Sequence, residues 1–154
     1  MKPNIGLSDA QREGSVSILN TLLSDEYVLY TKTRNYHWNV FGPQFDDLHK
    51  FFERQYEELE EVVDQVAERA RSLGGRSFGT LTEFLEHTRL KEQPGEYPDA
   101  RRMLSNLLAD HESLIRKLRA DLAIEGMDNF LTELMERHEK MAWMLRAFLE
   151  GPSP

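Results

Sequence analysis

Apolar residues recur along most of the chain at every third or fourth position, the spacing that places side chains on one face of an α-helix. This pattern predicts four long helices and no strand. The first runs from Ser8 to a break at Gly42, and the others cover about residues 46–73, 99–124 and 128–149. The first helix has two apolar stripes, as expected for a helix that packs on both a bundle core and a neighbour.

Capping signals support these boundaries. Ser8 with Gln11, and Thr80 with Glu83, each have the spacing of a capping box at a helix start. Thr80 therefore opens a short helix over about residues 80–87, and the glycines at 74–75 suit a left-handed helix end.

The lengths of the connections indicate the topology. The first and third connections are short, so each helix pair is antiparallel. The middle connection, about 25 residues long, can cross the whole bundle. The sequence therefore predicts an all-α four-helix bundle with one long crossover, and the crossover carries a short helix. This is the ferritin-like arrangement. We expect a single domain over residues 1–154, with polar tails at about 1–7 and 150–154.

Composition narrows the chemistry. The chain has no cysteine, which excludes disulfides, thiolate zinc sites, iron–sulfur ligation and cysteine nucleophiles. Any metal site must use His, Asp and Glu. No apolar run approaches the length of a membrane span, and residues 1–12 lack the apolar stretch of a secretory signal, so we expect a cytoplasmic protein without a membrane partner.

The helix predicted over 46–73 carries a row of ionisable side chains beside its apolar stripe. At about 100° of rotation per residue, the row covers an arc of about 100° and consists of His49, Glu53, Glu60, Asp64 and Glu68. Asp64 and Glu68 are one turn apart, where like charges repel mildly unless a cation binds between them. A solvated acidic face explains the same row, so spacing alone leaves both interpretations open.

Two histidines favour the metal interpretation. His37 is near the end of the first predicted helix and His49 is near the start of the second. Antiparallel packing across the short turn therefore brings their imidazoles close within one subunit. A single histidine on an apolar stripe is usually a core residue, but two that converge beside carboxylates are less common. Imidazole and carboxylate together suit ferrous iron.

The spacing of these candidates on one helix indicates a site between subunits. His49 and Asp64 are fifteen residues apart, or about 22 Å along the helix axis, so one chain cannot bring both to the same ion. An antiparallel two-fold pairing that crosses near residues 56–58 would place His49 opposite Asp64 and Glu68 of the partner subunit, twice per dimer.

A metal site inside one bundle is the alternative. Di-iron bundles commonly build it from Glu-x-x-His motifs on two helices. No histidine in this chain has a glutamate three residues before it, so we do not expect that type of site.

Two segments resemble the characteristic motifs of the Dps family of ferritin-like mini-ferritins. They are HWNVFGPQFDDLH, residues 37–49, and VDQVAERARSLGG, residues 63–75. The similarity extends over the whole chain, including the helix order and the short helix in the crossover. Ser77 departs from the family pattern, which has Pro or Ala there.

The resemblance implies a hollow dodecamer that oxidises Fe(II), preferentially with hydrogen peroxide rather than oxygen, stores the ferric mineral and protects against oxidative stress. Its ferroxidase centre, with one or two irons, would lie at a two-fold interface. By motif position, the catalytic metal ligands would be His37 and His49 from one chain and Asp64 and Glu68 of the partner subunit. Glu53 stands where many members have Asp, and would reach the metal directly or through water.

The resemblance bears on several other residues. Trp38 matches a tryptophan that intercepts oxidising radicals beside the site, although a packed interface aromatic explains it equally well. His111 and His138 lie on apolar stripes and are expected in the core, and His87 is expected at the surface. The region that lines a pore in the family is shorter here than in many members and contains Glu125, Asp128 and Asn129.

Two other functions compete with iron oxidation. The family is named for DNA binding, but the net charge is −8 and the terminal segments have no cluster of Lys or Arg. We therefore expect no DNA binding. A purely structural bundle with a vestigial site is the third possibility, and the complete set of histidines and carboxylates argues against it.

Overall fold

The chain folds into helices joined by loops in the computed structural model, which describes residues 1–123 and 127–151 apart from the side chain of Asp128. The described residues contain no strand, as the periodicity predicts. The helices are α1 (Asp9–Asn39), α2 (Phe45–Ser72), α3 (Leu81–His87), α4 (Ala100–Asp121) and α5 (Asp128–Leu149). None of them combines the length and the apolar content that spanning a membrane requires.

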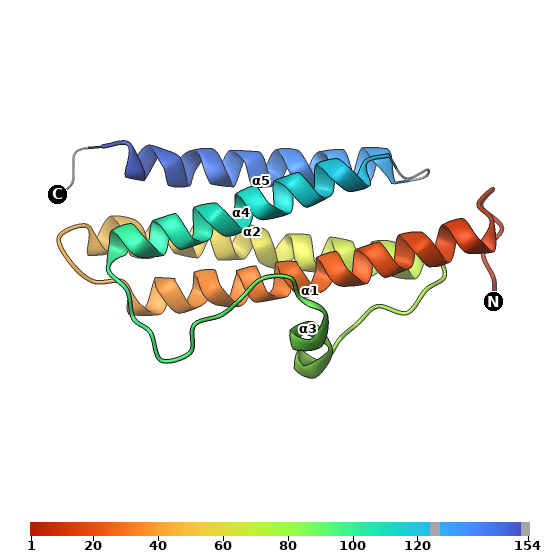
Figure 1. Ribbon diagram of the computed structural model, residues 1–154, viewed down its shortest axis with the longest axis horizontal. Helices are drawn as coiled ribbons and strands as arrows, with labels where there is room; N and C mark the ends of the chain where they lie inside the picture. The colour runs from red at the N-terminus through yellow and green to blue at the C-terminus, as the bar shows by residue number, and fades with distance from the viewer. Residues whose placement is uncertain (124–126, 152–154) are drawn as a thin grey trace.

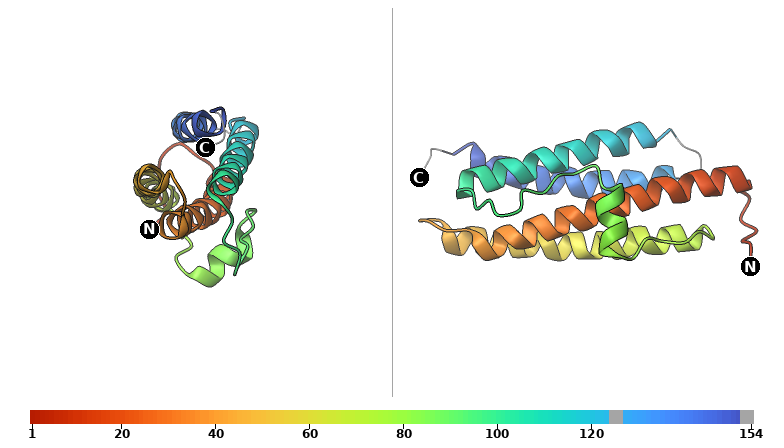
Figure 2. Two further views of the ribbon diagram at one scale, coloured as in Figure 1. Left: turned by 90° about the vertical axis from the view of Figure 1, so that its left-hand side faces the viewer. Right: turned by 60° about the horizontal axis from the view of Figure 1, so that its bottom comes forward.

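The four long helices form a bundle, and α3 lies outside it. Figure 1 shows α1 and α2 as one antiparallel pair and α4 and α5 as another. The crossover that joins α2 to α4 runs back along α1. Seen end-on in Figure 2, the order around the bundle is α1, α2, α5, α4. This is the ferritin-like four-helix bundle with a long crossover, so the predicted topology is confirmed.

Most of the predicted helix ends are also confirmed. Ser8 and Thr80 are N-caps, and each forms the capping box that its sequence predicts. Gly74 follows α2 with a φ of 82°, a conformation that glycine adopts without strain. The prediction for α4 was too long, because this helix ends at Asp121, and Ile124 lies outside the described residues.

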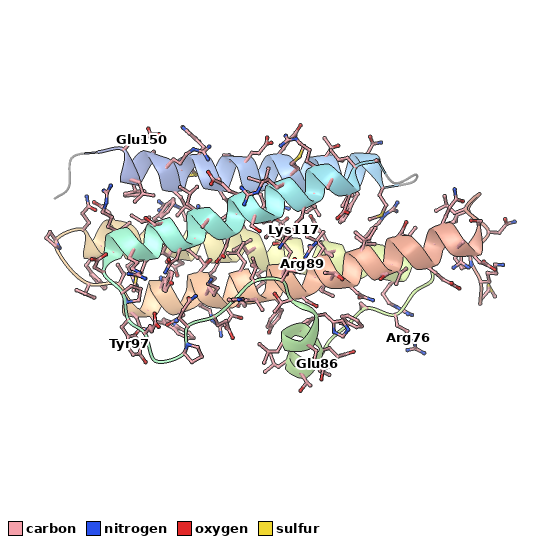
Figure 3. All side chains as sticks on the ribbon, in the orientation of Figure 1. Arg76, Glu86, Arg89, Tyr97, Lys117 and Glu150 are labelled. Atoms are coloured by element: carbon pink, nitrogen blue, oxygen red, sulfur yellow. The ribbon has the colours of Figure 1, made fainter. Side chains whose placement is uncertain are left out.

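The crossover is fastened to the bundle by a buried carboxylate. Asp25, on α1, is fully buried, and its Oδ1 accepts hydrogen bonds from the Arg89 backbone N–H at 2.6 Å and the Thr88 hydroxyl at 3.0 Å. Its Oδ2 accepts from Arg89 Nε at 2.8 Å. Arg89, labelled in Figure 3, lies where the segment after α3 passes the middle of the bundle. These contacts fix the path of the crossover, and α3 with it, against α1.

Candidate metal centre

His37 and His49 form a stacked pair across the α1–α2 turn. Their ring centroids are 3.8 Å apart and the ring planes differ by 17°. Each ring is held by the other residue's backbone: His37 Nδ1 lies 2.7 Å from the carbonyl oxygen of His49, and His49 Nδ1 lies 2.8 Å from that of His37. The structure therefore brings together the two histidines that the sequence predicts to meet.

This geometry defines how the two imidazoles are protonated. A carbonyl oxygen only accepts hydrogen bonds, so both Nδ1 atoms must donate. In a neutral imidazole the other nitrogen, Nε2, then carries the lone pair that binds a metal. An Nδ1–H bonded to a backbone carbonyl is the usual way to fix the orientation of a metal-binding histidine. The pair is thus pre-organised as two Nε2 ligands.

Aromatic side chains surround the histidine pair on both sides. Phe45 stacks on His49 with ring centroids 5.1 Å apart, and Tyr56 meets His37 edge-on at 5.2 Å. His37 is buried, whereas Trp38, the next residue, is 62% exposed. Trp38 lies against the guanidinium of Arg34, whose Cζ is 4.8 Å from the centre of the indole ring.

The predicted carboxylates are distributed along α2. Glu53 follows His49 by one turn and is half-buried, whereas Asp64 and Glu68 are exposed toward the other end of the helix. Asp64 lines a groove of about 430 Å³, here called the Asp64 groove, together with Tyr27, Tyr30, Glu60, Val63 and Ala67. The structure does not bring Asp64 or Glu68 to the histidine pair of the same chain.

The part of one chain that the structure describes does not group a full set of metal ligands. Within residues 1–123 and 127–151, no group of three or more His, Cys, Asp or Glu side chains is arranged to hold a metal ion. The histidine pair offers two nitrogen ligands, and the Asp64 groove offers carboxylate oxygen from a separate part of α2. Any centre that uses both must combine two chains.

A buried polar cluster inside the bundle was missed by the sequence interpretation. His111 and His138 are in the core, as predicted, but they contact each other through Nδ1 at 2.9 Å. His138 Nε2 lies 2.6 Å from Glu26 Oε1, and Glu26 is also fully buried. Burial and the neighbouring His138 hold the pKa of His111 well below its ordinary value. The signal in the sequence was Glu26, which lies between Leu22 and Leu29 at helical spacing on an apolar stripe of α1.

The predicted pore residues are only partly described. Glu125 lies outside the described residues, as does the side chain of Asp128, at the start of α5. Asn129 is exposed near the beginning of the same helix. His87 is exposed on α3, as expected, and its ring packs against Phe78 at 4.4 Å.

The fold and the overall sequence have counterparts in known proteins. The model of the ferritin-like domain family matches residues 16–152. A DNA protection during starvation protein of Brevibacillus brevis is 38% identical over 139 residues, covering 86% of this chain and 93% of its own.

The chain belongs to the Dps family of ferritin-like proteins.

Another relative, an uncharacterized low temperature-induced protein of Nostoc, is 49% identical over 96% of this chain and 87% of its own. The crystal structure of the Dps protein from Vibrio cholerae has a TM-score of 0.90 and 31% identity, and covers 97% of this chain and 98% of its own. That protein is described as a member of a broad superfamily of ferritin-like diiron-carboxylate proteins. Membership of the Dps family agrees with the resemblance that the two sequence motifs indicate.

Proposed function

We propose that the protein is a ferroxidase and iron-storage protein that protects the cell against oxidative stress. Iron is its substrate, bound and oxidised at centres shared between subunits. The observation that carries this proposal is the histidine pair. Its two Nε2 lone pairs are oriented by backbone carbonyls, and the described residues of the same chain do not form a group of three metal ligands around them. The family's association with di-iron carboxylate proteins supports iron as the metal.

Each centre would combine ligands of two kinds. His37 and His49 provide nitrogen from one chain, and Asp64 and Glu68 of the partner subunit provide carboxylate oxygen. Glu53, one turn from His49, adds a carboxylate directly or through a water molecule. Nitrogen and carboxylate oxygen suit ferrous iron, and the anionic ligands favour the ferric product because they offset its higher charge.

The exposed apolar surface supports a two-fold partner. α3 exposes Leu81 and Leu85, and its Phe84 stacks on Tyr27 at 4.5 Å, beside the Asp64 groove. Large exposed apolar side chains that gather next to a groove are typical of protein interfaces. An isologous pairing over this face repeats the same contact twice and completes two centres.

The finer points of the proposal concern the product and the assembly. Hydrogen peroxide is the preferred oxidant and oxygen the slower one. The ferric mineral collects inside a hollow dodecamer in the cytoplasm. The overall charge of −8 per chain attracts cations and disfavours nucleic acid.

The experiment that tests this function combines assembly and kinetics. Metal-free protein is first weighed by native mass spectrometry, and its Fe(II) oxidation is then followed under oxygen and under peroxide without oxygen. We expect a dodecamer, saturable oxidation that is faster with peroxide, and iron that co-elutes with the protein shell. A monomer, or oxidation no faster than in buffer, would overturn the proposal.

A further inference from the structure

Glu26, His111 and His138, here called the core cluster, join the two helix pairs through the middle of the bundle. Glu26 is on α1, His111 on α4 and His138 on α5, and all three are fully buried. Since α5 lies diagonally across from α1 in the end-on view (Figure 2), the 2.6 Å contact between His138 Nε2 and Glu26 Oε1 crosses the core. The contact between the Nδ1 atoms of His138 and His111, at 2.9 Å, extends the cluster to α4.

The two helix pairs meet less closely than the helices within each pair. The backbones approach one another more closely between α1 and α2, and between α4 and α5, than from one pair to the other. A buried polar cluster that bridges the pairs is therefore placed where the bundle is easiest to open. Loss of its hydrogen bonds would weaken the contact between the pairs more than the contact within either of them.

Acid breaks the core cluster because the cluster can hold only a limited number of protons. A hydrogen bond between two imidazole nitrogens needs one donor and one acceptor, so the Nδ1–Nδ1 contact holds a single proton. The contact between His138 and Glu26 holds another. When both rings carry two protons each, both Nδ1 atoms are donors and their hydrogen bond is lost. Two cations then lie side by side in the core, and Glu26 can balance only one of them.

We propose that the core cluster is an acid-sensitive joint. When both of its histidines are protonated, the α1–α2 pair and the α4–α5 pair separate at the middle of the bundle. The cluster shares no residue with the histidine pair of the α1–α2 turn or with the Asp64 groove. The joint therefore works without iron, and its test is independent of the proposed function.

The affinity of His111 for a proton in water drives the opening. In the closed bundle, burial and the neighbouring His138 hold the pKa of His111 well below its ordinary value of 6.5. The titratable groups that face it are His138 and, beyond His138, Glu26. In the open form, water solvates the ring and restores the ordinary pKa. The open form therefore takes up a proton below about pH 6.5 that the closed form does not, and the open fraction rises by up to about tenfold for each unit that the pH falls.

The other groups at the joint respond differently to acid. α2 contributes the amide of Gln55, which is buried and does not titrate. Asp25, next to Glu26, is paired with Arg89 of the crossover. Lys32 of α1 and Asp110 of α4 form an ion pair at 2.5 Å, and burial raises the pKa of Asp110. Protonation of Asp110 therefore favours the closed form, so this pair does not drive an opening in mild acid.

Hydrogen–deuterium exchange followed by mass spectrometry tests the joint on assembled, metal-free protein. Exchange is measured at about pH 7.5 and about pH 5.5, on either side of the ordinary histidine pKa, and each rate is corrected for the intrinsic pH dependence of amide exchange. The test variants are His111→Gln and His111→Leu, which remove the titratable ring with a polar and an apolar side chain. The matched control is His87→Gln, at an exposed position.

We expect corrected exchange in the centres of α4 and α5 to be at least several-fold faster at the lower pH in the native protein and in His87→Gln. The start of α1, which Arg12 fastens to the Leu73 carbonyl at the end of α2, should show little change. Neither test variant should show the rise, because a cluster with one histidine cannot hold two imidazolium rings.

Three results would overturn the joint. They are no rise in the native protein, an equal rise in the test variants, and a rise of the same size at the start of α1, which would mean that the whole subunit unfolds. Circular dichroism and native mass spectrometry at neutral pH identify a variant that does not fold or assemble. The other variant then decides, together with the regional pattern of exchange in the native protein.

Discussion

His37 and His49 hold each other in place through their backbones: each ring donates its Nδ1–H to the other residue's carbonyl, and the rings stack 3.8 Å apart. The two residues belong to different helices, so this reciprocal contact also fixes α1 against α2 at their common turn. The same hydrogen bonds that orient the two Nε2 atoms therefore fix the distance between them.

Loss of any main ligand should slow iron oxidation strongly. We expect this for His37→Ala, His49→Ala, Asp64→Ala and Glu68→Ala, and a smaller effect for Glu53→Ala. The fold should persist, because exposed carboxylates contribute within about 0.5 kcal/mol to stability and a lost histidine hydrogen bond costs about 1 kcal/mol. Stopped-flow oxidation and circular dichroism measure both effects. Fe(II) oxidation in the four main variants as fast as in the native protein would contradict the proposed metal centre.

Buried His111 should make the protein less stable in mild acid. The pKa of His111 is held well below its ordinary value of 6.5 by burial and by His138. The unfolded chain therefore takes up a proton below about pH 6.5 that the folded chain does not, and the free energy of unfolding falls by at most about 1.4 kcal/mol per pH unit.

Urea denaturation at about pH 7.5 and about pH 5.5, on either side of the ordinary histidine pKa, measures this loss. His111→Gln cannot titrate, so it should lose less stability on acidification than the native protein. His87→Gln, at an exposed position, should behave like the native protein. An equal pH dependence in all three proteins would show that His111 is not the source.

The buried carboxylate under the crossover should matter for stability. Asp25→Ala leaves the Arg89 backbone N–H and guanidinium without their acceptor. We expect a loss of about 2–4 kcal/mol, less than for a fully buried pair because Arg89 is partly exposed. Asp25→Asn keeps one acceptor oxygen and should lose less. Thermal unfolding measures the loss, and a melting temperature unchanged in Asp25→Ala would contradict this account of the crossover.

DNA should not bind to the assembled protein. The net charge of −8 per chain repels phosphate, and binding by counterion release requires clustered Lys or Arg. We predict no retardation of linear DNA in a gel-shift assay with metal-free protein at physiological salt and neutral pH. Tight binding that weakens with added salt would reveal a basic surface formed only on assembly.

Much of the fold could be predicted because local signals agree with one another. Helix ends depend on interactions between residues that are close in the sequence, so the sequence alone can predict them. Examples are the capping boxes at Ser8 and Thr80 and the glycine after α2. The end of α4 was placed too late because Leu122 continues the apolar spacing of Leu114 and Leu118 beyond Asp121, the last residue of the helix.

The buried acidic residues of α1 could not be predicted in the same way. Asp25 and Glu26 are fully buried because their partners, Arg89 and His138, come from distant parts of the chain. Such pairing depends on tertiary contacts that no local pattern encodes. The histidine pair was predictable because its two members flank a short turn. The sequence also predicts that Asp64 and Glu68 of the partner subunit complete the metal site, because His49 and Asp64 lie too far apart on one helix to bind the same ion. This part of the site stays a prediction.

Mixed assemblies of two inactive variants test the shared centre most directly. In a dimer of one His49→Ala chain and one Asp64→Ala chain, one site loses both groups. The other takes His49 from the Asp64→Ala chain and Asp64 from the His49→Ala chain, and is complete. Co-expressed chains are purified as mixed shells, confirmed by mass, and assayed for Fe(II) oxidation beside each parent variant. With equal and random mixing, about a quarter of all sites should recover, and mixed shells as inactive as either parent would contradict a centre shared between subunits.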